Sequence, residues 1–140
     1  MAQDHDHDHA HDHSHHDHDH DHDHGHHHHA EPGTVSAVAT EETPVRHRVE
    51  VTVAAERVDR EFERAYRDLG KRARIKGFRP GKVPRGVLER MYGPSLAEEL
   101  EDTLVRQTLS EAIEQTHLEP VTEPSVDATS PKPGEAFRYT

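Results

Sequence analysis

The sequence has no cysteine, no tryptophan and few aromatic residues of any kind. Without cysteine the chain can form neither disulfides nor thiolate metal sites, which fits a reducing compartment. Three Phe, three Tyr and 30% apolar residues among 140 allow only one small folded domain. No apolar run is long enough to cross a bilayer, and the N-terminus lacks the basic start and apolar stretch of a signal peptide. These absences favour a soluble cytoplasmic protein with no membrane partner.

The charges are unevenly distributed along the chain. Residues 1–42 hold eleven acids and no Lys or Arg, and they account for the formal net charge of −11. Residues 43–140 balance seventeen bases against seventeen acids. Within them, residues 71–85 (KRARIKGFRPGKVPR) carry seven bases and no acid. The pattern predicts an acidic tail joined to a folded domain that has one strongly basic edge.

Residues 4–29 alternate His and Asp almost without interruption. Nothing apolar offsets the entropy of ordering, so residues 1–42 are expected to be a disordered tail followed by a linker. The small polar stretch from Glu31 to Pro44 is the expected linker, and its length predicts that tail and domain act independently. Imidazole is the commonest protein metal ligand and Asp adds oxygen ligands, so the tail could hold Zn, Ni or Cu. The alternative is a solvated tail with no metal role in the cell. The candidate metal ligands are His5, His7, His9, His11, His13, His15, His16, His18, His20, His22, His24, His26, His27, His28 and His29.

The folded part begins with a strand and a helix. Valines alternate with polar residues over 45–53, which predicts a half-buried strand with His47 on its apolar, partly buried side. Residues 57–74 then place apolar side chains three and four apart, which predicts an amphipathic helix. Its predicted core side is formed by Val58, Phe62, Ala65, Tyr66, Leu69 and Ala73.

Two helices and short strands are expected to follow. Residues 84–93 predict a short helix that begins at Pro84 and stops at Gly93. A longer helix should run from a capping box at Ser95 and Glu98 to about Thr116. Short strands are expected at Val121 to Val126 and from Phe137. The order predicts an α+β domain, with two longer helices and one short helix packed against a small antiparallel sheet.

The stretch IKGFRPGKVPRG, residues 75–86, places a single aromatic residue among glycines, prolines and cations. Its glycines permit unusual backbone conformations, whereas Pro80 and Pro84 stiffen the chain. The result is a pre-shaped surface loop. Phe78 is then either an exposed anchor for a partner's apolar pocket, with cations that reach carboxylates or phosphates, or a plug that folds back into the core. The residues alone do not choose between these readings.

The motif G-F-R-P-G-K-V-P resembles the signature loop, G-F-R-x-G-K-x-P, of the trigger factor family of ribosome-associated chaperones. The resemblance extends over about residues 43–140: the alternating strand, the helix that runs into R-I-K-G-F-R, the M-Y-G stop and the acidic helix start all follow that family's N-terminal domain. It implies docking on the large ribosomal subunit, at a ribosomal protein and rRNA beside the tunnel exit, and contact with nascent polypeptides.

The resemblance also assigns residues. It implies a ribosome-binding site formed by Gly77, Phe78, Arg79, Gly81, Lys82 and Pro84. The basic edge that supports this site is Lys71, Arg72, Arg74, Lys76 and Arg85. Family members often have a base where Pro80 stands, so one cationic contact is expected to be missing.

Two departures from the family pattern limit what the resemblance implies. No peptidyl-prolyl isomerase domain or client-cradling helical domain follows within 140 residues, so we expect no catalytic residue and no isomerase activity in this chain. The chain also stops within what the family uses as a long strand, which suggests a truncated fragment with an incomplete last strand.

Other classes of function are weaker. A generic RNA-binding module fits the basic run but has few aromatic residues for stacking. A metal buffer fits the tail, with the folded domain as its carrier. An enzyme fits least, because outside the tail only His47 and His117 are conventional bases. No cofactor is required, and weak self-association stays open.

Overall fold

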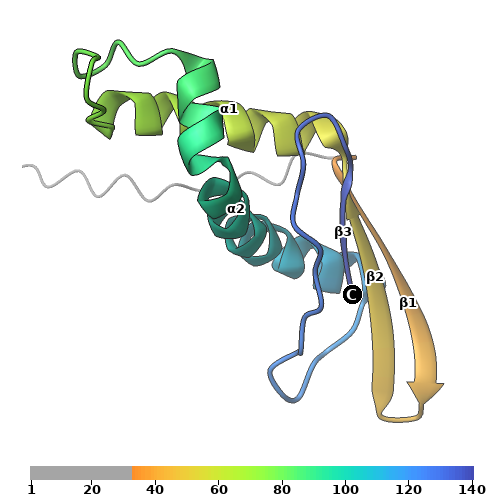
Figure 1. Cartoon of the computed structure of the whole chain (residues 1–140). Coiled ribbons are helices and arrows are strands. Elements are labelled where there is room, and N and C mark those ends of the chain that lie inside the picture. Colours follow the sequence, from red (N-terminus) through yellow and green to blue (C-terminus); the bar gives the residue numbers. More distant parts are fainter. Residues whose placement is uncertain (1–32) are drawn as a thin grey trace, which may run out of the picture.

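The computed structural model describes residues 33–140 of the protein. These residues form a three-stranded sheet and two helices. The elements follow in the order β1 (Val35–Thr43), β2 (Arg46–Val53), α1 (Ala55–Arg72), α2 (Arg85–Thr116) and β3 (Phe137–Tyr139). The sheet is antiparallel, with the order β1-β2-β3. Figure 1 shows the helices joined at one end of the molecule and the β1–β2 hairpin extending away at the other. The predicted α+β class is confirmed.

The first strand corrects the predicted linker. Residues 35–43 form β1, which pairs with β2 along its whole length from Val35 opposite Val53 to Thr43 opposite Arg46. The stretch has small and β-branched residues but little apolar alternation, so its strand character comes from its partner rather than from its own pattern. The disorder and metal ligands predicted for the His/Asp-rich tail lie outside the described residues.

Strand β2 is where predicted, but its burial differs at one end. Val51 and Val53 are buried, whereas Val45 is 92% exposed and His47 is exposed too. The hairpin turn projects beyond the helices (Figure 1), so neither α1 nor α2 covers it. The prediction that His47 is partly buried is therefore wrong.

Helix α1 buries the predicted apolar stripe, with Val58, Phe62 and Tyr66 in the core. The predicted division of the next segment into two helices is wrong. Helix α2 is continuous over 32 residues with Pro94 inside it, and Ser95 lies within the helix instead of capping a new one. Proline removes one intrahelical donor and bends a helix, and in Figure 1 the first part of α2 runs in a different direction from the rest.

The C-terminal segment contributes one short strand to the sheet. β3 pairs with Val51–Val53 of β2, and Phe137 and Tyr139 are both buried. The Tyr139 hydroxyl lies 2.8 Å from that of Thr108, which itself donates to the Leu104 carbonyl. Burial raises the pKa of the Tyr139 hydroxyl.

The strand predicted around Val121 is absent from the described residues: Val121 is 97% exposed, and a single bridge joins Ala128 to Tyr139 instead.

A nearly buried ion pair connects the first turn of α1 to the last turns of α2. The two terminal nitrogens of Arg57 lie 3.1 and 3.0 Å from the carboxylate oxygens of Glu111, and the side chains are only 9% and 13% exposed. Arg57 also lies 3.3 Å from the Thr34 hydroxyl, just before β1. One guanidinium therefore fixes both helices and the entry to the sheet.

Replacing Glu111 with Ala should lower the free energy of unfolding by about 3 kcal/mol, because Arg57 would remain buried without its carboxylate. Urea denaturation measures the change. Glu114→Ala is the matched control: Glu114 is exposed on the same helix, so its loss should change stability by less than about 0.5 kcal/mol. Equal, small losses in both variants would contradict the role of the pair.

Candidate ribosome-docking loop

The loop of residues 73–84 joins α1 to α2 at the end of the molecule far from the hairpin turn (Figure 1). Its ends are held by the helices: the Ala73 amide donates to the Leu69 carbonyl, and Pro84 caps the start of α2 by accepting from the amides of Val87 and Leu88. Ile75 and Val83 are half-buried and pack against the core. The residues between them form the tip.

Two successive hydrogen-bonded turns shape the tip. The Phe78 amide donates to the Ile75 carbonyl at 3.1 Å, and the Lys82 amide donates to the Arg79 carbonyl at 3.0 Å. The third position of each turn is a glycine with positive φ, +95° at Gly77 and +79° at Gly81. Pro80 occupies the second position of the second turn, where its fixed φ is favourable. The turns therefore require both glycines, and they favour Pro80.

Phe78 lies between the two turns and is 41% exposed, and it does not belong to the core cluster. The alternative of a core plug is therefore wrong for this structure. Ile75 and Val83 instead attach the loop to the core. The structure leaves Phe78 with apolar surface in water at the tip.

The seven bases of residues 71–85 divide into two groups. Lys71 lies 3.6 Å from Asp68, and Arg72 donates to the Asp68 carbonyl, while Arg85 is held by two carboxylates. The other four are exposed and have no ion pair within residues 33–140. We name these four the loop cations: Arg74, Lys76, Arg79 and Lys82.

Arg85 is a structural clamp between the helices. Its guanidinium binds Glu63 of α1 with both terminal nitrogens, at 3.2 and 2.9 Å, and Glu89 through Nε at 2.8 Å. It also lies 4.0 Å above the centre of the Tyr66 ring, a cation–π geometry. The hydrogen bond from Arg85 lowers the pKa of Glu63, whereas burial raises the pKa of Tyr66. Arg85 was predicted to support the basic edge, but its contacts fix the start of α2 beside the loop.

One of these contacts could be predicted from the sequence. Arg85 and Glu89 are four apart on one helix face, a spacing that predicts an ion pair. The partner on α1, Glu63, lies 22 residues earlier, and no local pattern connects the two. The pair between Arg57 and Glu111 was missed for the same reason, since 54 residues separate them.

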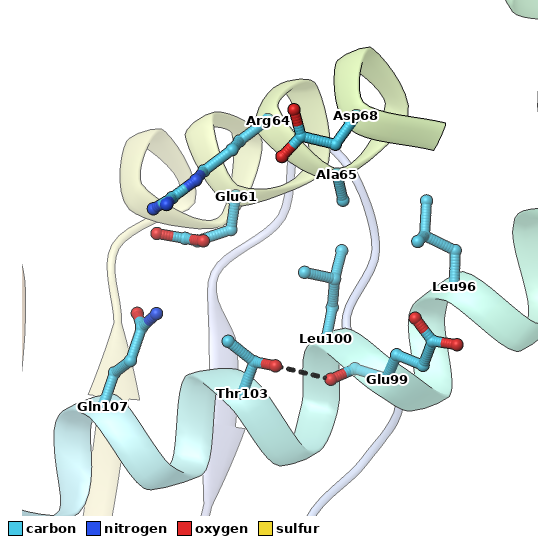
Figure 2. Close-up of a pocket in the computed structure, with 9 residues that line it drawn as sticks. All are labelled: Glu61, Arg64, Ala65, Asp68, Leu96, Glu99, Leu100, Thr103 and Gln107. Atoms are coloured by element: carbon cyan, nitrogen blue, oxygen red, sulfur yellow. Dashed lines mark hydrogen bonds between the residues drawn. The ribbon is translucent and has the colours of Figure 1, made fainter. Parts of the chain in front are cut away.

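A separate groove of about 300 Å³ lies between α1 and α2 (Figure 2). Its apolar lining is Ala65, Leu96 and Leu100, and charged side chains from both helices surround it. No residue of the loop lines this groove, so it is distinct from the loop surface. Across residues 33–140 we find neither a group of three metal-ligating side chains nor a helix that could span a membrane.

Comparison with known proteins decides the family. A family model described as bacterial trigger factor protein (TF) matches residues 36–140. The chain belongs to the trigger factor family. It is 40% identical over 99 residues to a trigger factor of an Anaeromyxobacter species, covering 70% of this chain and 23% of that protein. It is 42% identical over 92 residues to the Halorhodospira halophila trigger factor, covering 66% and 21%.

A solved structure of trigger factor domains from Thermotoga maritima matches the fold, with a TM-score of 0.54 and 25% sequence identity. The match covers 69% of this chain and 86% of that structure. The chain spans 21% to 23% of the length of the trigger factors described above. These matches concern the N-terminal part of trigger factor and assign no isomerase activity to the chain.

Glycine is required at the second turn of the loop but not at the start of α2. Gly81→Ala should lower the free energy of unfolding by about 1 kcal/mol, because alanine is strained at a φ of +79°. Gly86→Ala, five residues later, should instead raise it by less than about 1 kcal/mol, because Gly86 is helical and has open space around it. Thermal unfolding of both variants measures whether each substitution raises or lowers stability. If Gly86→Ala lowers stability as Gly81→Ala does, the strain at Gly81 does not explain the effect.

Proposed function

We propose that this domain docks on the large ribosomal subunit through the loop of residues 73–84. The observation that carries the proposal is the exposed aromatic ring of Phe78, held between two glycine turns and accompanied by four loop cations. Membership of the trigger factor family supports it. The docking residues would be Phe78, Arg79 and Lys82, on a frame formed by Gly77, Gly81 and Pro84.

The chemistry of the loop fits a partner made of protein and RNA. An aromatic ring buried in an apolar pocket is a typical interface anchor, and guanidinium and ammonium groups bind phosphates. Because the two turns fix the tip in advance, little conformational entropy is lost on binding. Docking beside the tunnel exit would let the domain meet nascent polypeptides in the cytoplasm.

Replacing Phe78 with Ala should weaken binding to isolated large subunits roughly 30-fold, equivalent to about 2 kcal/mol at an interface anchor. Arg79→Ala and Lys82→Ala should each weaken binding and reduce the slope of log affinity against log salt by about one. Cosedimentation across a salt series measures both quantities.

Two matched controls lie outside the loop. Met91→Ala removes another exposed apolar side chain, 56% exposed, and Arg138→Ala removes an exposed base on β3. Both variants should bind subunits as the unaltered chain does. If all the variants bind alike, the loop is not the docking site. If naked rRNA binds as tightly as whole subunits, a generic RNA-binding module is the better description.

A second proposal concerns the tail. Fifteen His alternate with Asp over residues 4–29, and such side chains are suitable ligands for Zn²⁺, Ni²⁺ or Cu²⁺. The described domain offers no competing group of three ligands, and its two histidines are exposed and apart in the fold, with His47 on β2 and His117 directly after α2. We propose that the tail is the metal-binding part of the chain.

Calorimetric titration with Zn²⁺ and Ni²⁺ tests this assignment. The full chain should bind several ions with release of heat and protons, because protonated imidazoles must lose their protons to bind metal. A chain lacking residues 1–30 should show none of this binding. Retention of the same binding after the deletion would place the metal in the folded domain instead.

A further inference from the structure

The loop cations form an exposed, positively charged surface between α1 and α2. Arg74, Lys76, Arg79 and Lys82 are exposed and make no ion pair within residues 33–140. The nearby acids of α1 and α2 are already engaged: Asp68 with Lys71, and Glu63 and Glu89 with Arg85. At moderate ionic strength such a cluster attracts any anionic segment within reach.

The same chain contains an anionic segment. Residues 1–32 hold eight Asp and Glu31, with no Lys or Arg. With histidine neutral, these nine acids carry most of the formal net charge of −11. The segment and the loop cations are therefore opposite in sign and covalently joined.

The acidic segment is not separated from the folded domain by a long linker. The expected linker is mostly strand β1, so the acidic segment ends at the edge of the folded domain. The chain is held there by two contacts of Thr34, whose carbonyl accepts from the Ala54 amide at 2.8 Å and whose hydroxyl contacts Arg57. Both contacts lie at the start of α1.

The distance from this point to the loop is set by α1. Its 18 residues rise by about 27 Å, and the loop follows directly. A chain of 32 residues can extend to roughly 100 Å. This length is enough for every Asp of residues 1–32 to reach the loop. An intramolecular ligand on such a tether acts at an effective concentration of around millimolar.

We propose that the acidic tail is an intramolecular ligand of the loop cations that competes with ribosomal phosphate, and that metal binding by the tail weakens this competition. The inference rests on the proposed docking and metal-binding functions. About four Zn²⁺ ions held by neutral imidazoles would cancel nearly all of the nine acidic charges. Metal loading would then expose the loop for docking.

The test compares two full-length variants of the tail. In the first, all eight Asp are changed to Asn, which removes charge but keeps every His; in the second, all eight become Glu, which keeps the charge. Amide NMR resonances of Gly77, Phe78, Gly81 and Lys82 report on the loop without any ribosome present. The amide of Val45, at the hairpin turn, is the internal reference.

At about 20 mM salt the loop resonances of the Asn variant should differ from those of the unaltered chain and the Glu variant. At about 0.5 M salt, where the screening length is roughly 4 Å, the difference should disappear. Zn²⁺ alone should move the loop resonances of the unaltered chain towards those of the Asn variant. In low salt the Asn variant should bind large subunits roughly threefold to tenfold more tightly.

Different outcomes test the contact between tail and loop, its release by metal, and docking through the loop. Identical loop resonances in the Asn and Glu variants at low salt would overturn the tail contact. If Zn²⁺ shifts the tail histidines but leaves the loop unchanged, metal does not release the loop. If the loop resonances respond as expected but subunit affinity is the same in both variants, the tail contact stands and docking through this loop is wrong.

Discussion

The ion pair between Arg57 and Glu111 is the constraint on which the arrangement of the domain depends. Fourteen buried apolar residues form the core of residues 33–140, and apolar burial is not directional. The guanidinium, which belongs to α1, contacts Glu111 of α2 and Thr34, the residue before β1, at once. A nearly buried pair contributes little net stability because of its desolvation, but its fork geometry is specific. Burial holds the domain together, and this contact selects one arrangement.

A polar side chain of α2 also contacts the edge strand of the sheet. The Gln115 side chain of α2 accepts from the Ala37 amide at 3.1 Å and donates to the Val35 carbonyl at 3.0 Å. It therefore occupies edge groups of β1 that would otherwise be open to pairing with another chain. At the other end of the helices, Arg85 joins α2 to α1 beside the loop. Polar contacts from α2 thus position both the sheet and the loop.

The predictable parts are those with a strong local pattern. The stripe of Val58, Phe62 and Tyr66 predicted α1, and the glycines and prolines predicted a shaped loop. The errors have physical causes. Strand β1 depends on its pairing with β2, which no local pattern reveals, and Pro94 produced a bend where the sequence pattern indicated a break. His47 follows the alternation correctly, but the helices do not extend far enough to cover it. Long-range pairs such as Arg57 with Glu111 leave no periodic signal.

Pro80 shapes the second turn of the loop, so its role is more than the absence of a cationic contact. A base at this position would add one charge to a loop that already presents four cations without a partner among residues 33–140. Proline instead fixes φ before a glycine that must adopt +79°. Charge contributes over several ångströms and is screened by salt, whereas the direction of an aromatic anchor depends on backbone angles. Because Phe78 lies two residues before Pro80, between the two turns, the rigidity that proline gives the second turn also helps to fix the position of the ring. Proline at position 80 therefore contributes to a fixed position of the ring rather than a fifth charge.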